Sequence, residues 1–117
     1  MGHAIVEKAN AVSQSSNTLT VDASDGGLFT TTVTANISTF AINNLVAGQA
    51  ITIIFTNDGT GGYTITTSIA VNGGSAAAIK TAGGGGWTMS TAANAIDIVT
   101  FLYDGTNLYA VPQQAWA

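Results

Sequence analysis

The stretch AITIIFT, residues 50–56, decides the fold class of this 117-residue chain. Ile51, Ile53 and Phe55 alternate with other residues, so three large apolar side chains share one face, as they do along a β-strand. Ile54 lies on the opposite face, which is therefore not wholly polar. The stretch predicts a strand with one face in a core and the other face only partly open to water.

The same alternation marks further strands on both sides of this stretch. It recurs from residue 17 to 21, from 29 to 35, from 40 to 42, from 63 to 67 and from 108 to 111. Residues 95–103 carry apolar side chains on both faces, which predicts a central strand of a sheet. The Gly- and Asn-rich stretches 57–62 and 104–107 predict two hairpins. We expect an all-β fold, a compact antiparallel β-sandwich or jelly-roll-like barrel.

The chain divides into three parts. Residues 1–16 are expected to form a short extended N-terminal arm, 17–112 the β-domain and 113–117 a C-terminal tail. Two interpretations of the arm stay open, a frayed terminus and an arm that orders against a neighbouring subunit. Pro112 cannot donate to a β-ladder, so it is expected to close the sheet region.

Five large apolar residues are candidates for an interface. The Gly- and Ala-rich stretch 72–94 lies between the predicted hairpins, and irregular chain of this length is typical of an interface loop. Its alanines are compatible with one short helical turn. Large apolar groups in this loop and at the two ends of the chain need a cover. They are Ile5, Val6, Trp87, Met89 and Trp116.

The small number of charged residues limits the classes of partner that this chain is expected to bind. Only two residues are Lys or Arg and six are Asp or Glu, whereas about 25% of an ordinary soluble domain is charged. A net charge of −4 with Lys8 and Lys80 as the only cations argues against nucleic acid. No apolar run approaches the ~20 residues of a membrane helix, so no membrane partner is expected. The surface is therefore either polar without charge or covered by other protein.

The residues that could carry chemistry are few. His3, the only histidine, lies in the arm, which argues against a Ser-His-Asp triad. Asp25, Asp58 and Asp104 each precede Gly, where Asp bonds to its own backbone. Asp97 stands in an apolar strand, where backbone donors would satisfy an inward carboxylate. An interface or catalytic role for it stays open.

Two motif-like stretches carry no chemistry. Residues 22–25 lack the ligand spacing of a calcium loop, and the glycines at 83–86 precede Trp87 rather than a phosphate-loop Lys. The absence of cysteine excludes disulfides and thiolate metal sites. We predict no enzymatic activity, no cofactor and no metal.

Three segments in order carry a family likeness. They are IIFTNDGTGGYTIT (53–66), STAANAIDIVTF (90–101) and YDGTNLY (103–109). Together they resemble a β-structured module of tailed-bacteriophage virion proteins, found in fibres, spikes and small head proteins. The likeness spans about residues 17–110. The chain departs from it at 67–69 and 73–86, where such modules often carry Trp and Pro.

The resemblance implies a structural protein of the virion. A fibre would normally add an attachment domain and a shaft, so we expect a small capsid decoration, or cement, protein on the outer capsid surface. It would form a homotrimer and bind a major capsid protein. The alternative is a receptor- or glycan-binding module of a tail or head fibre. In that case Tyr63, Trp87, Tyr109 and Trp116 would offer stacking faces for a glycan.

Overall fold

A computed structural model describes residues 9–84 and 87–116, with side chains up to Gln114. The described residues form strands joined by loops and two single 3₁₀ turns, which confirms the predicted β-rich class. The strands are β1 (Ala9–Ala11), β2 (Thr18–Asp22), β3 (Leu28–Val33), β4 (Thr39–Asn43), β5 (Ala50–Asn57), β6 (Ser68–Val71), β7 (Ala76–Ala78), β8 (Ile96–Tyr103) and β9 (Leu108–Trp116). The 3₁₀ turns are η1 (Ala23–Asp25) and η2 (Ala82–Gly84).

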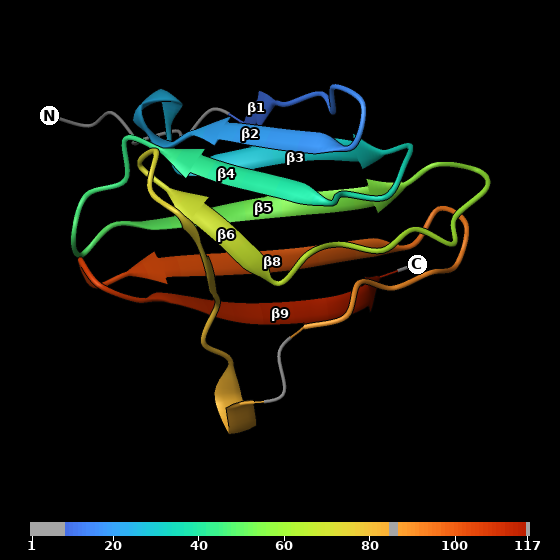
Figure 1. The fold of residues 1–117 in the computed structure, drawn as a ribbon. Helices are drawn as coiled ribbons and strands as arrows, with labels where there is room; N and C mark the ends of the chain where they lie inside the picture. Colours follow the sequence, from blue (N-terminus) through green and yellow to red (C-terminus); the bar gives the residue numbers. More distant parts are fainter. Residues whose placement is uncertain (1–8, 85–86, 117) are drawn as a thin grey trace, which may run out of the picture.

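Two mixed sheets enclose one core (Figure 1). The five-stranded sheet has the order β1-β3-β5-β8-β9, and the four-stranded sheet has the order β2-β4-β6-β7. From β1 to β6 the chain passes from one sheet to the other at every step. Strands two apart in sequence therefore lie side by side and parallel.

The antiparallel part of the fold begins only with the last three strands. β7 pairs antiparallel with β6, and β8 pairs antiparallel with β5 and β9. The expectation of a wholly antiparallel arrangement is therefore wrong for β1 to β6. The physical reason is that parallel neighbours need a crossover, and here each crossover is itself a strand of the opposite sheet.

One of the two predicted hairpins forms. Residues 104–107 join β8 to β9 as expected, and β8 lies between β5 and β9. The stretch 63–67 does not return beside β5. Within it, Ile65 makes a single bridge to Ile37, and the next strand, β6, belongs to the other sheet.

The sheet extends past both expected boundaries of the β-domain. β1 lies within the predicted arm and pairs with β3, and β9 continues through Pro112 to Trp116. The Ala110 N–H points away from β8, because it donates to Lys80 O at 2.8 Å. Pro112, two residues on, points its nitrogen to the same side of β9, away from β8, so its missing N–H costs no bond of the β8–β9 ladder.

Phenylalanines from both sheets form the centre of the core. The ring of Phe40 in β4 meets Phe55 of β5 at 6.3 Å and Phe101 of β8 at 5.8 Å, both edge to face. All three side chains are 1% exposed or less. Such aromatic pairs contribute about 0.5–1.5 kcal/mol each beyond their buried area. These contacts join the four-stranded sheet to the five-stranded one.

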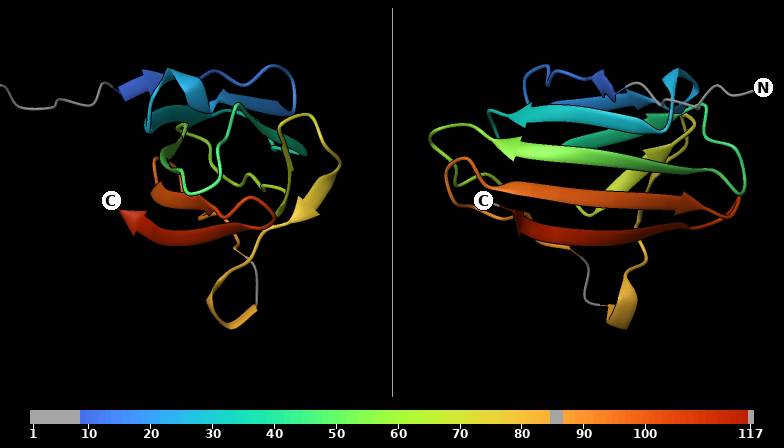
Figure 2. Two further views of the ribbon diagram at one scale, coloured as in Figure 1. Left: turned by 90° about the vertical axis from the view of Figure 1, so that its left-hand side faces the viewer. Right: turned by 180° about the vertical axis from the view of Figure 1, so that it is seen from behind.

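The chain after β6 closes one side of the molecule. β7 pairs with β6, and Lys80 pairs with Tyr109 of β9, so this segment links an edge of each sheet. The alanines at 76–78 are thus strand rather than helical turn. Beyond Lys80 the segment with η2 stands away from both sheets (Figure 2).

Candidate docking face

The outer face of the five-stranded sheet carries no charged side chain among the described residues. Along each strand, outward positions alternate with buried ones, and the outward side chains are hydroxyl-bearing, amide or apolar. They are Ala9, Ala11, Leu28, Thr30, Thr32, Ala50, Thr52, Ile54, Thr56, Ile96, Ile98, Thr100, Leu102, Tyr109, Val111 and Gln113. We call this set the uncharged face.

Large apolar groups gather at the β8–β9 end of the uncharged face. Leu102 is 45% exposed, Tyr109 38% and Val111 57%. Leu102 stands opposite Tyr109, and Val111 stands opposite Thr100, whose hydroxyl lies 3.1 Å from that of Thr52. Leu102, Tyr109 and Val111 form an apolar strip. Contiguous exposed apolar side chains with a polar surround are typical of interaction sites.

The outer face of the four-stranded sheet differs in side-chain size. Apart from Asp22 and Asn43, which end β2 and β4, its outward residues on β2, β4 and β6 are Thr18, Thr20, Thr39, Ala41, Ser68 and Ala70. None of these side chains is larger than Thr. This face can therefore stay in water at little cost, whereas the apolar strip gains free energy when it is covered.

Asp22, Asp58 and Asp104 lie at or just beyond the ends of strands, and only the last of them touches the uncharged face, through the Tyr109 hydroxyl. The Asp58 carboxylate accepts hydrogen bonds from Thr60 N at 2.9 Å, Gly61 N at 3.1 Å and the Tyr63 hydroxyl at 2.8 Å. The Thr60 N–H, followed by the Tyr63 hydroxyl, lowers the pKa of Asp58 below its usual 3.8. The sequence predicted the Asp-to-backbone bonds, but it did not predict the tyrosine partner.

Asp104 repeats this arrangement. Its carboxylate accepts from Asn107 N at 2.6 Å, Thr106 N at 2.8 Å and the Tyr109 hydroxyl at 2.9 Å. The Asn107 N–H makes the largest contribution to a lowered pKa of Asp104. The signal for both turns is the repeated pattern Asp-Gly-Thr-x-x-Tyr at 58–63 and 104–109.

Asp22 also serves its own turn. Its Oδ1 accepts from the Ser24 hydroxyl at 2.6 Å, from Asn44 Nδ2 at 2.8 Å and from Ser24 N at 3.0 Å. These bonds, with the Ser24 hydroxyl first, lower the pKa of Asp22. Within residues 9–84 and 87–116, no three His, Cys, Asp or Glu side chains group as metal ligands would.

Two buried polar side chains hold the segment that precedes β8. Asp97, 1% exposed, accepts from Ser90 N at 2.7 Å. Asn57, 3% exposed, donates from Nδ2 to Ser90 O at 2.8 Å and to Ala92 O at 2.9 Å. Asp97 thus faces inward and bonds a backbone donor, one of the two outcomes anticipated for it. Sequence reasoning missed Asn57.

This anchoring places Trp87 and Met89 in the core. Each is 3% exposed, and the Trp87 ring lies 5.3 Å from that of Phe55. The reason for expecting an interface at these two residues is removed, because the chain covers them itself. Ile5, Val6 and His3 lie outside the described residues. Trp116 ends β9, and its side chain is also outside them.

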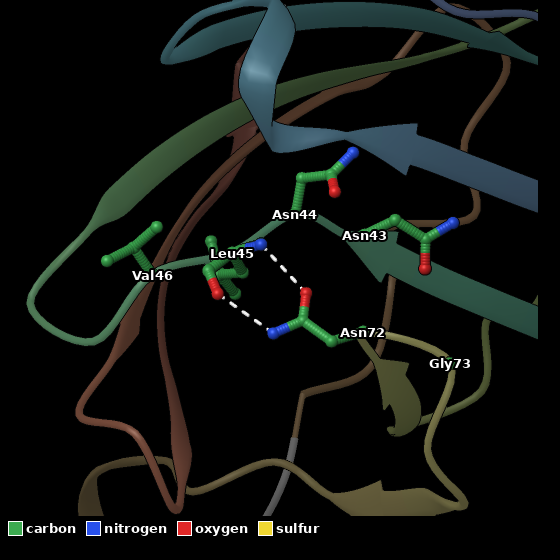
Figure 3. A pocket seen from close by; sticks show the side chains of 6 residues that line it. All are labelled: Asn43, Asn44, Leu45, Val46, Asn72 and Gly73. Atoms are coloured by element: carbon green, nitrogen blue, oxygen red, sulfur yellow. Dashed lines mark hydrogen bonds between the residues drawn. The ribbon is translucent and has the colours of Figure 1, made fainter.

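A hollow lies beside β4 and β6, and amide side chains that line it make hydrogen bonds within the chain (Figure 3). The Asn72 amide accepts from Leu45 N and donates to Leu45 O, both at 2.8 Å. Asn44 donates to Asp22. Asn44 and Asn72 have φ of 60° and 53°, a conformation that Asn tolerates better than most residues. These hydrogen bonds hold the chain where it reverses after β4 and after β6.

Comparisons with protein-family models, with curated proteins and with solved structures find no match for this chain. Among the described residues, no helix is long and apolar enough to span a membrane. The candidate site therefore rests on the geometry of the uncharged face and its apolar strip.

Proposed function

We propose that this chain is a structural subunit that docks on another protein through the uncharged face. The observation that carries this proposal is the combination of an apolar strip with a whole sheet face free of charge. The centres of protein interfaces are depleted in charged residues and enriched in aromatic ones. Among the described residues, the buried side chains of Asn57 and Asp97 bond backbone atoms of the chain itself. Two buried polar atoms, Thr31 Oγ1 and Trp87 Nε1, have no hydrogen-bond partner.

Within this class, we propose a capsid decoration protein of a tailed bacteriophage. It would form a homotrimer on the outer surface of the head and bind the major capsid protein. The ordered likeness of three segments to phage virion modules supports this assignment, and the two layers of strands would be a variant of a sandwich or jelly roll. Such a protein stabilises the capsid shell by mass action, because it binds the assembled shell and not the separated capsid subunits.

The alternative, a glycan- or receptor-binding module, has weaker support. Tyr109 is 38% exposed on the uncharged face and offers a stacking surface. Trp87, however, is buried, and Tyr63 is partly buried against the core. Two of the four aromatic residues expected to bind a glycan are thus used within the fold.

The copy number in purified virions tests the assignment. Quantitative mass spectrometry should find hundreds of copies per particle, and heads lacking the protein should release DNA at a lower temperature than complete heads. A few dozen copies at the tail would favour the fibre alternative. Absence from the particle, or unchanged heat resistance, would refute a decoration role.

A matched pair of variants tests the docking face. Leu102→Lys places a charge in the apolar strip, whereas Thr20→Lys places one on the exposed outer side of β2. The first variant should bind protein-depleted heads much more weakly than the second. Equal binding by both would show that the uncharged face is not the docking surface.

A further inference from the structure

A groove runs between strand β9 and the segment that follows β7. It encloses about 560 Å³. Two backbone bonds fix the segment to the strand, from Lys80 N to Leu108 O and from Ala110 N to Lys80 O, both at 2.8 Å. The groove is thus built into the fold. Its lining includes Lys80, Thr81 and Ala82 on one side and Tyr109, Val111 and Pro112 on the other.

The groove combines apolar walls with one positive charge. Val111 and Tyr109 are among the most exposed large apolar side chains of the described chain, at 57% and 38%. Lys80 is exposed and is the only cation among the described residues. In a chain of net charge −4, Lys80 is the one described cation that can pair with a carboxylate. The chemistry of the groove fits a short apolar stretch followed by an acidic residue.

The chain itself contains such a stretch, Ala4-Ile5-Val6-Glu7. Glu7 is the only glutamate of the sequence. The aspartates at positions 22, 58, 97 and 104 are bound to neighbouring backbone or side chains, and Asp25 follows Ser24 rather than an apolar stretch. We propose that the groove binds residues 4–7 of a second copy of this chain. Ile5 and Val6 would lie against Tyr109 and Val111, and the Glu7 carboxylate would pair with the Lys80 ammonium.

The reach of the chain decides in favour of a second copy. β1, which begins at Ala9, lies at the opposite edge of the sheet from β9. Four inter-strand spacings of about 4.8 Å separate these edges by roughly 19 Å. Ile5 precedes Ala9 by four residues, which span at most about 14 Å when extended. The segment therefore cannot fill the groove of its own chain.

The exchange joins copies of this chain to one another and is separate from docking on a partner. Each copy would give one segment and receive one, a head-to-tail exchange that closes into a ring when the rotation between copies allows it. The groove shares Tyr109 and Val111 with the apolar strip. In an exchanged assembly, docking on a partner would therefore use Leu102 and the part of the uncharged face on β1, β3, β5 and β8.

Charge reversal in the full chain tests the exchange. Lys80→Glu and Glu7→Lys each place like charges together, and the double variant restores an opposite pair. Sedimentation over a concentration series should show each single variant dissociating at roughly three- to tenfold higher concentration than wild type, as expected for an exposed ion pair turned repulsive. The double variant should return to within about threefold of wild type.

Matched controls separate this exchange from folding and from docking. Lys8→Gln changes the charge next to Glu7 without touching the proposed pair and should assemble as wild type. Thr32→Lys charges the uncharged face at β3, away from the groove, and should also self-associate normally, even if it binds heads more weakly. Equal melting temperatures of wild type and Lys80→Glu, measured at a concentration where both are dissociated, would show that the fold is intact.

Three results would overturn the exchange. They are a monomeric wild type at every concentration, a double variant as weak as the weaker single variant, and unchanged association after removal of residues 2–8. Each is measured on the isolated protein. A failure here is therefore distinguishable from a failure to bind heads.

Discussion

The two turns with the pattern Asp-Gly-Thr-x-x-Tyr share their local bonding but differ in the path that the chain takes beyond them. In each, the first carboxylate accepts from the N–H groups two and three residues on and from the tyrosine hydroxyl five residues on. The turn at 104–109 closes the β8–β9 hairpin, whereas the turn at 58–63 leads the chain to the other sheet. The local pattern thus specifies the turn and leaves the path of the chain open.

A distant segment accounts for the difference. In the second turn, Asp104 N donates to Asn107 O at 3.2 Å and the strands continue as a pair. In the first, Gly62 N donates to Thr91 O at 2.7 Å, and Asn94 N donates to Asp58 O at 3.0 Å. Residues 91–94 therefore take the hydrogen bonds that a returning strand would otherwise make.

Gly61→Ala should destabilise the protein most, because it breaks the contact between the first turn and residues 91–94. Gly61 has φ of +70°, and an added Cβ would lie 2.4 Å from Thr91 O and 2.8 Å from Ala93 N. We expect the free energy of unfolding in urea to fall by about 2–4 kcal/mol, from backbone strain and overpacking.

Two glycines serve as controls for this variant. Gly59 has open space around it and no positive φ, so Gly59→Ala should change stability little. Gly105, in the second turn, has φ of +97°, with Ala47 Cβ at 3.2 Å. Its Ala variant should be intermediate, at about 1–2 kcal/mol. Equal losses for Gly61→Ala and Gly105→Ala would mean that the two turns do not differ in this way.

Asn57→Ala should have the next largest effect on stability, because it releases residues 90–94, which bind the first turn in place of a returning strand. The variant leaves Ser90 O and Ala92 O without their buried donor. We expect a loss of about 1–3 kcal/mol in the same unfolding measurement. Asn107→Ala is the matched change in the second turn. Its backbone N–H, which the substitution keeps, supplies the bond to Asp104, so it should cost less than Asn57→Ala.

The strands were predictable because alternation is a local property. Ile51, Ile53 and Phe55 face the core as expected, Ile54 is half-buried on the other face, and Val99 and Phe101 line the core from β8. Alternation tells which face a residue takes, but not which strand lies alongside. The parallel pairs of β1 to β6 were missed for this reason.

The candidate site was predictable only in part. The two apolar faces of residues 95–103 indicated that the outer side of β8 needs a cover, and Leu102 is indeed 45% exposed. Trp87 and Met89 were assigned to an interface because nothing near them in sequence covers them. Their burial depends on bonds from Asn57 and Asp97 to Ser90, contacts that no local pattern encodes.

Acid should weaken both turns, because the pKa values of Asp58 and Asp104 are lowered in the fold. Each carboxylate contributes stability above its unfolded pKa of about 3.8, and this stability is lost as the pH falls through the lower folded value. Asp58→Asn and Asp104→Asn should each lower the melting temperature at pH 7. Near pH 2 both variants should melt close to wild type, and a constant difference at all pH values would contradict this cause.

The smallest effects come from removing the tyrosine hydroxyls, and here the turns should differ again. The hydrogen bond to Asp58, followed by burial, raises the pKa of Tyr63 above its usual 10. Its contribution to stability is present below that value and is lost as the pH rises through the higher folded pKa. Absorbance titration should show one phenol ionising late in wild type and earlier in Asp58→Asn. Tyr63 packs against the core, whereas Tyr109 is 38% exposed. Tyr63→Phe should therefore lower the melting temperature more than Tyr109→Phe. The reverse order would show that exposure does not set the strength of these hydrogen bonds.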